Sequence, residues 1–77
     1  MITLSATQEE LEYICYELND EVTSLVHREI WLDFMNFKME VTLNAFEKIM
    51  YYLEEGYLKN RFQIQFNNWR ENEMHIL

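Results

Sequence analysis

The spacing of apolar residues changes along the chain, and this change limits the folds that the chain can adopt. Between residues 11 and 26, apolar residues recur three and four positions apart, which predicts an amphipathic helix. Between residues 36 and 44, apolar and polar residues alternate, which predicts a strand with one buried face. A chain that contains both periods is expected to pack helices against a sheet, as α+β proteins do.

Capping signals mark the start of the first helix. It is expected to begin at Ser5 or Thr7, because Glu10 stands three residues after Thr7 in a capping-box pattern. Its apolar stripe predicts one continuous helix as far as Val26, with His27 at the C-terminal end. The stripe consists of Leu11, Ile14, Cys15, Leu18, Val22, Leu25 and Val26.

A second helix is expected to start after Asn44, with Glu47 three positions further on. Its apolar residues again recur at helical spacing, from Phe46 to Leu53. Gly56 is the only glycine in the chain, and it is expected to end this helix in a left-handed conformation.

Four segments have the alternation that is typical of strands: residues 2–4, 30–34, 36–44 and 62–66. The two halves of the chain also resemble each other, since each has a strand, a capped helix and another strand. We therefore expect the ferredoxin-like βαββαβ arrangement, in which two helices cover one face of a four-stranded antiparallel sheet.

Two parts of the chain leave alternatives open. Because proline is absent and glycine occurs once, residues 29–60 could continue as helix, and an all-α helical bundle is the alternative fold. Residues 67–77 are expected to form an extra edge strand or a loose tail, since Asn67 and Asn68 suggest a turn. With 77 residues, the chain has the length of a single small domain, residues 1–77.

Charge and composition exclude several classes of function. The chain has 14 acidic and 6 basic residues and a net charge of −8, which excludes nucleic-acid binding by a broadly basic surface. No apolar stretch approaches the roughly 18 residues of a membrane span, and the first residues lack the pattern of a secretory signal. The single cysteine, Cys15, indicates a reducing compartment, so a cytoplasmic protein is expected.

The sequence contains no motif that is typical of an enzyme. A nucleophile elbow, a phosphate-binding loop, a dinucleotide-binding fingerprint and zinc-ligand spacing are all missing. Cys15 lies on the apolar stripe of the first helix, which favours a buried core residue over a reactive thiol. We expect a protein without enzymatic activity, and we assign no catalytic residue, cofactor or metal.

The acidic residues gather in one part of the chain. Residues 1–40 have a net charge of −7, and six acids without a base lie between residues 9 and 21. On a regular helix, which rises about 1.5 Å per residue, this cluster forms a row roughly 18 Å long with a charge density like that of DNA phosphates. Tyrosines among these acids are suitable interface anchors. The predicted partner-binding residues are Glu9, Glu12, Tyr13, Tyr16, Glu17 and Asp20.

These features favour an acidic inhibitor or adaptor that binds a basic surface of a larger protein. The expected partner is a nucleic-acid enzyme, such as a restriction or CRISPR-type nuclease, a polymerase or a toxin nuclease, which the chain engages as a nucleic-acid mimic. Phage anti-defence proteins and immunity proteins share this size and acidity. We expect no direct binding to nucleic acid or to a membrane.

Two alternatives remain at this stage. The acidic helix face could serve only to keep a small domain soluble. The chain could also be a self-associating structural or regulatory domain that forms a homodimer through exposed aromatic residues. The residues that would carry this dimer contact are Trp31, Phe62, Phe66 and Trp69.

Overall fold

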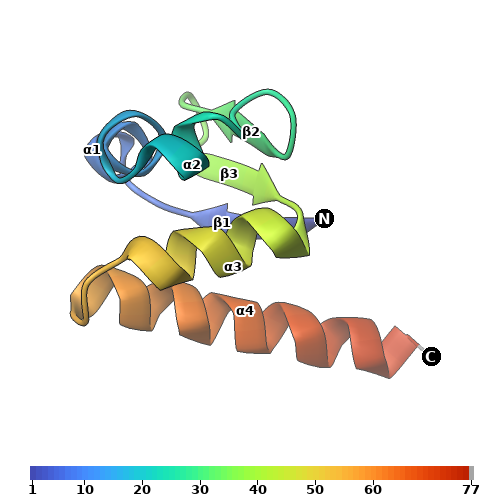
Figure 1. The fold of residues 1–77 in the computed structure, drawn as a ribbon. Helices are drawn as coiled ribbons and strands as arrows, with labels where there is room; N and C mark the ends of the chain where they lie inside the picture. The colour runs from blue at the N-terminus through green and yellow to red at the C-terminus, as the bar shows by residue number, and fades with distance from the viewer. Residues whose placement is uncertain (77) are drawn as a thin grey trace.

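The computed structural model describes residues 1–76, and it describes the side chains of residues 1–73. The chain has the α+β class that its sequence predicts (Figure 1). Its elements, in order, are β1 (Ile2–Ser5), α1 (Gln8–Glu12), the π-helical turn η1 (Tyr13–Glu17), α2 (Asp20–Thr23), β2 (Ile30–Asp33), β3 (Lys38–Val41), α3 (Leu43–Tyr52) and α4 (Tyr57–Ile76).

The three strands form an antiparallel sheet in the order β1-β3-β2. Val41 of the central strand lies opposite Ile2 on one side and Ile30 on the other. All three side chains point to the same face and are buried, whereas their neighbours Thr3, Trp31 and Glu40 are exposed on the other face. The alternation in the sequence therefore identified the strands and the side of the sheet that carries the core.

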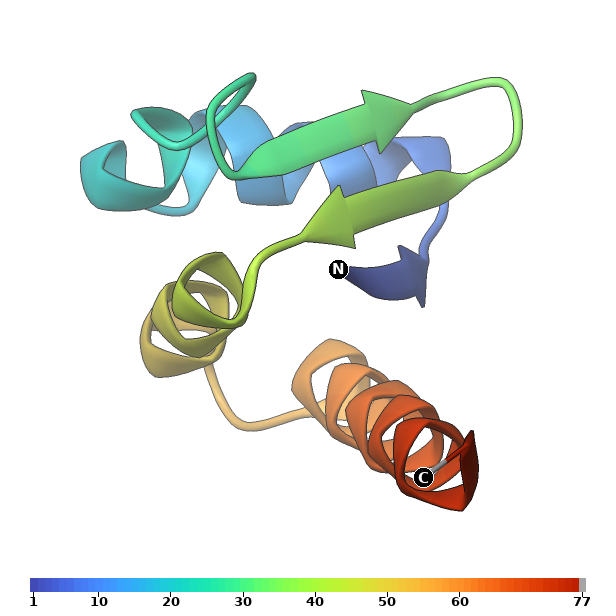
Figure 2. The same ribbon diagram turned by 90° about the vertical axis from the view of Figure 1, so that its right-hand side faces the viewer.

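The core lies against this one face of the sheet. Side chains from η1, α2, α3 and α4 meet the strand residues there, and Figure 2 shows α4 running beside β1 at the edge of the sheet. Burial of this apolar surface is the main source of the stability of the fold. The largest fully buried side chains are Phe62, Ile2, Leu4, Leu11, Ile14, Ile30, Met39, Ile49, Val22, Val41 and Cys15.

The first helix begins as its sequence predicts but does not continue unbroken. The Thr7 Oγ1 accepts the Glu10 N–H at 3.1 Å, and the Glu10 carboxylate accepts the Thr7 N–H at 2.9 Å, so the capping box is confirmed. The chain then widens into η1 and leaves the helical conformation at Asn19. The Asn19 side chain accepts the Glu21 N–H at 2.9 Å and so starts α2, which ends at Thr23.

The second helix starts two residues earlier than expected. Thr42, and not Asn44, is the N-cap of α3, and its Oγ1 accepts the Ala45 N–H at 3.1 Å. The Asn44 side chain instead donates a hydrogen bond of 3.0 Å to Glu29. The helix ends at an extended Leu53, and Gly56 has a negative φ, so the expected left-handed glycine cap is wrong.

Residues 57–76 form the helix α4 where a strand over 62–66 and an edge strand or tail over 67–77 were expected. Apolar side chains follow one stripe of this helix, at Leu58, Phe62, Phe66 and Trp69. Phe66 stacks on Phe46 of α3 with the ring centroids 4.6 Å apart, and Trp69 stacks on Phe66 at 5.9 Å. The predictions for residues 62–66 and 67–76 are therefore wrong, and Leu77 lies outside the described residues.

Within residues 1–76 the sheet consequently has three strands, and these residues do not form the ferredoxin-like order. The all-α alternative is also wrong, because β1, β2 and β3 pair with one another. In a βαββαβ arrangement the fourth strand lies beside β1, and here α4 occupies that place. The Gln65 amide accepts the Ser5 N–H at 2.6 Å and donates to the Ser5 carbonyl at 3.0 Å, so one side chain supplies hydrogen bonds that a strand would have made.

Candidate interaction surface

All six predicted partner-binding residues are exposed. Glu9 and Glu12 lie on α1, Tyr13, Tyr16 and Glu17 lie on η1, and Asp20 is the first residue of α2. Tyr13 and Tyr16 retain 40% and 55% of their accessible surface, so both rings offer apolar area to a partner. We call these six residues the acidic helix face.

The π-helical turn changes the shape of the acidic helix face. The Leu18 N–H bonds to the Tyr13 carbonyl at 2.9 Å, five residues earlier, which widens the helix at this point. Ile14 and Cys15 of the same turn are fully buried. Turns of this kind occur frequently at functional sites. Because the helix widens and then breaks at Asn19, the expected straight row of carboxylates at regular helical spacing is wrong.

Two acids of the predicted cluster contact cations of other elements. The Glu10 carboxylate lies 2.7 Å from Arg61 of α4, and the Glu21 carboxylate lies 3.5 Å from Lys48 of α3. Partial burial opposes ionisation of Glu10, but hydrogen bonds from Arg61 and from the Thr7 backbone hold its pKa below the ordinary value. Glu10 and Glu21 therefore connect elements of the fold.

The other four acids point to solvent. Within the side chains that the structure describes, none of the carboxylates of Glu9, Glu12, Glu17 and Asp20 forms an ion pair. Their charge is compensated by water and salt, and it can act on an approaching molecule. This separation of paired from unpaired acids could not be read from the sequence, because Lys48 and Arg61 lie far away along the chain.

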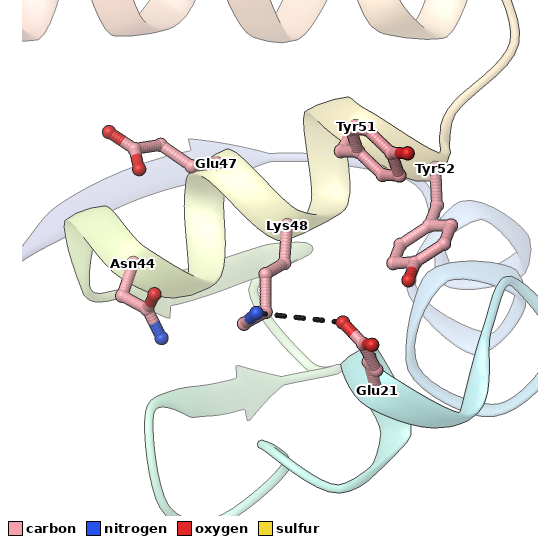
Figure 3. A pocket seen from close by; sticks show the side chains of 6 residues that line it. All are labelled: Glu21, Asn44, Glu47, Lys48, Tyr51 and Tyr52. Carbon is pink, nitrogen blue, oxygen red and sulfur yellow. Dashed lines mark ion pairs between the residues drawn. The ribbon is translucent and has the colours of Figure 1, made fainter.

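A hollow of about 410 Å³ between α2 and α3 was not predicted. Figure 3 shows the Glu21 carboxylate between the ammonium of Lys48 and the hydroxyl of Tyr52. The rings of Tyr51 and Tyr52 are perpendicular, with centroids 4.9 Å apart. Partial burial and the interaction with Glu21 raise the pKa of the Tyr52 phenol. The residues that line this α2–α3 hollow are Glu21, Asn44, Glu47, Lys48, Tyr51 and Tyr52.

The neighbouring tyrosines Tyr51 and Tyr52 were the feature of the sequence that could have indicated the α2–α3 hollow. Tyr51 retains 77% of its accessible surface, which is unusual for a large aromatic residue on a helix that packs against a core. Glu21 and Lys48 are 27 positions apart, so their approach depends on how α2 packs against α3.

Three further features bear on function: the Cys15 thiol, the grouping of possible metal ligands and the length and apolar character of the helices. Burial raises the pKa of the Cys15 thiol to about 11, which keeps it protonated and unreactive near neutral pH. Among the described residues, no three His, Cys, Asp or Glu side chains are grouped to hold a metal ion. No helix within residues 1–76 is both long and apolar enough to cross a membrane.

The four aromatic residues proposed for a dimer contact do not share one surface. Phe62 is fully buried in the core, and Phe66 and Trp69 are half-buried in the stack on α3. Trp31 is separate from them and retains 43% of its accessible surface on the exposed face of the sheet.

No protein-family model, curated protein or solved structure matches this chain.

Proposed function

We propose that this chain is a small, non-enzymatic inhibitor or adaptor that binds a basic surface of a larger protein. The observation that carries this proposal is the acidic helix face, which combines four carboxylates without ion pairs to the described residues with the exposed rings of Tyr13 and Tyr16. Such a face would act in a reducing compartment such as the cytoplasm, where the single cysteine stays a thiol.

Charge on the acidic helix face would guide the first encounter with the partner. A surface that carries one sign of charge attracts a complementary surface over about 10 Å at ordinary ionic strength and raises the rate of association. A nucleic-acid enzyme is the favoured partner because its substrate groove is built to neutralise closely spaced negative charges. The chain would compete with nucleic acid for that groove.

The tyrosines would slow the release of the partner. Each ring has a large apolar area and few rotatable bonds, and its hydroxyl can remain hydrated or accept a hydrogen bond. Tyr13 and Tyr16 belong to a turn that Ile14 and Cys15 anchor in the core, so little backbone entropy is lost when a partner covers the two rings.

Charge reversal on the acidic helix face tests this proposal. The double variant Glu12→Lys and Glu17→Lys changes two exposed residues whose side chains make no helix-capping hydrogen bond in the described structure. We expect it to capture at least about tenfold less partner from a lysate at low salt, because charged contacts control encounter and register. The measurement is elution from the immobilised chain, with the bound protein identified by mass spectrometry.

A matched control keeps the change in net charge the same. The variant Glu71→Lys and Glu73→Lys alters two exposed acids on α4 and should retain the partner. A short DNA duplex should release the partner from the wild-type chain if both occupy one basic groove. Equal capture by both variants, or a partner that duplex DNA does not displace, would contradict the proposal.

Self-association is a second candidate function, and the exposed Trp31 favours it. Trp31 belongs to β2 and lies on the uncovered face of the sheet, and the turn between β2 and β3 also exposes Met35 and Phe37. A dimer through this face would use Trp31 without Phe62, Phe66 or Trp69. Sedimentation should then show a dimer that Trp31→Ala converts to a monomer, and a wild-type monomer at high concentration would exclude it.

A further inference from the structure

The α2–α3 hollow has the features of a site for one cationic side chain. Its aromatic part is the perpendicular pair Tyr51 and Tyr52, and its charged part is the Glu21 carboxylate beside the Tyr52 hydroxyl (Figure 3). A cation can interact with the face of a tyrosine and with a carboxylate at the same time.

We propose that the α2–α3 hollow binds an arginine side chain of the basic partner, an inference that rests on the proposed function. The guanidinium group is planar, so it can stack on an aromatic ring while its N–H groups donate two parallel hydrogen bonds to a carboxylate. Glu21 would accept these hydrogen bonds, and Tyr52 would provide the ring. A lysine ammonium has no plane to stack and makes a single point contact.

Lys48 occupies the cation position in the free protein. Its Nζ lies 3.5 Å from Glu21 Oε2, and the two side chains retain 38% and 57% of their accessible surface. An exposed pair at this distance contributes little stability. The arginine of a partner can therefore displace Lys48, which would turn toward solvent.

The position of the hollow fits the proposed binding face. Glu21 directly follows Asp20, so the last acid of the acidic helix face and the first acid of the hollow lie in the same turn of α2. The four unpaired carboxylates would attract a basic surface, and the hollow would select one arginine on it.

Small arginine analogues test the hollow separately from any partner. The probe is N-acetyl-arginine methylamide, and backbone amide NMR shifts of the full chain are recorded at constant ionic strength. We expect the largest shifts at Glu21, Lys48, Tyr51 and Tyr52. The citrulline analogue, which has nearly the same shape without the charge, should produce no saturable shifts, and the lysine analogue should bind about two- to fivefold more weakly.

Removal of the Lys48 ammonium gives a second prediction, in which binding of the arginine probe becomes tighter. Lys48→Met should tighten binding of the arginine probe by about threefold, because the probe no longer competes with the ion pair. Lys38→Met removes the same charge from the exposed face of the sheet and should tighten binding less. Glu21→Gln should weaken binding, whereas Glu54→Gln, outside the hollow, should have little effect.

The outcomes separate this inference from the proposed function. Equal binding of the citrulline probe, or equal effects of Lys48→Met and Lys38→Met, would overturn the arginine site. Shifts confined to the acidic helix face would also overturn it, although partner binding there would still stand. If the probe shifts the hollow but Glu12→Lys and Glu17→Lys retain the partner, the proposed function fails and the cation site remains.

Discussion

Among the residues that the structure describes, two other than glycine have a positive φ, His27 at 69° and Phe37 at 55°. A side chain in this left-handed region crowds the following carbonyl and costs about 1–2 kcal/mol. His27 adopts this conformation in the turn after α2, where its N–H donates a hydrogen bond of 2.8 Å to the Ile30 carbonyl. The expected place of His27 at a helix end was wrong, since α2 ends at Thr23.

Glycine at this position should stabilise the fold. We expect His27→Gly to raise the free energy of unfolding by about 0.5–1 kcal/mol, because relief of strain exceeds the entropy that glycine adds to the unfolded chain. Urea denaturation measures the difference. The neighbouring Arg28 is exposed and has no positive φ, so Arg28→Gly should instead lower stability, and a gain in both variants would argue against the strain.

At the scale of elements, α4 protects the edge of β1. Gln65 makes two hydrogen bonds to the Ser5 backbone, and Arg61 adds a third to the Ser5 carbonyl at 3.2 Å. An unprotected strand edge can pair with another chain and lead to aggregation. The helix therefore contributes both core packing, through Phe62, and protection of the edge.

Loss of the Gln65 amide should expose that edge. We expect Gln65→Ala to lower the free energy of unfolding by about 1–2 kcal/mol, since two hydrogen bonds are lost, and to increase aggregation at high concentration. Gln63→Ala is the control, because Gln63 is exposed on the same helix and bonds only to Asn67 among the described side chains. Denaturation and light scattering measure both effects, and equal behaviour of the two variants would contradict this function of Gln65.

The sequence predicted the three strands because buried apolar residues alternate in each, although Trp31 also gives β2 an apolar residue on its outer face. Strands β2 and β3 are shorter than the alternating segments 30–34 and 36–44. The prediction failed at residues 62–66 because Phe62 and Phe66 fit a period of two and also lie one helical turn apart. Ile64, which the strand prediction placed with them, retains 50% of its accessible surface. Leu58 and Trp69 extend the helical stripe on both sides, so a window that included them would have favoured α4.

The candidate site was predictable only where it depends on local sequence. Exposure of Tyr13 and Glu17 follows from the apolar stripe on the opposite side of the helix. The widening at η1 and the pairing of Glu21 with Lys48 depend on how separate elements pack, and no spacing in the chain encodes them. The α2–α3 hollow was missed for the same reason.

For the whole molecule, the net charge is −8, and four acids without ion pairs to the described residues lie close together in sequence on the acidic helix face: Glu9, Glu12, Glu17 and Asp20. Neighbouring like charges on a helix destabilise it by about 0.2–0.5 kcal/mol per pair, and Glu9, Glu12 and Glu17 form no ion pairs within the described structure to offset this. A surface that serves only solubility gains nothing from such clustering, since dispersed charges of both signs work as well. A binding surface requires the clustering, and stability is often lower at functional sites.

If the acidic helix face binds a partner as proposed, binding and stability make opposite demands on its charge. In low salt, Glu12→Lys with Glu17→Lys should be more stable than the wild-type chain by about 0.5–1 kcal/mol, because attraction to the remaining acids replaces repulsion. The difference should shrink toward zero as salt reduces the screening length from about 10 Å to about 3 Å. Urea denaturation at several salt concentrations measures it.

Glu71→Lys with Glu73→Lys makes the same change in net charge on α4 and should gain less. If both variants gain equally, the penalty belongs to the net charge as a whole. If only the first gains and it also loses the partner, then the clustered carboxylates destabilise the fold and are needed for binding.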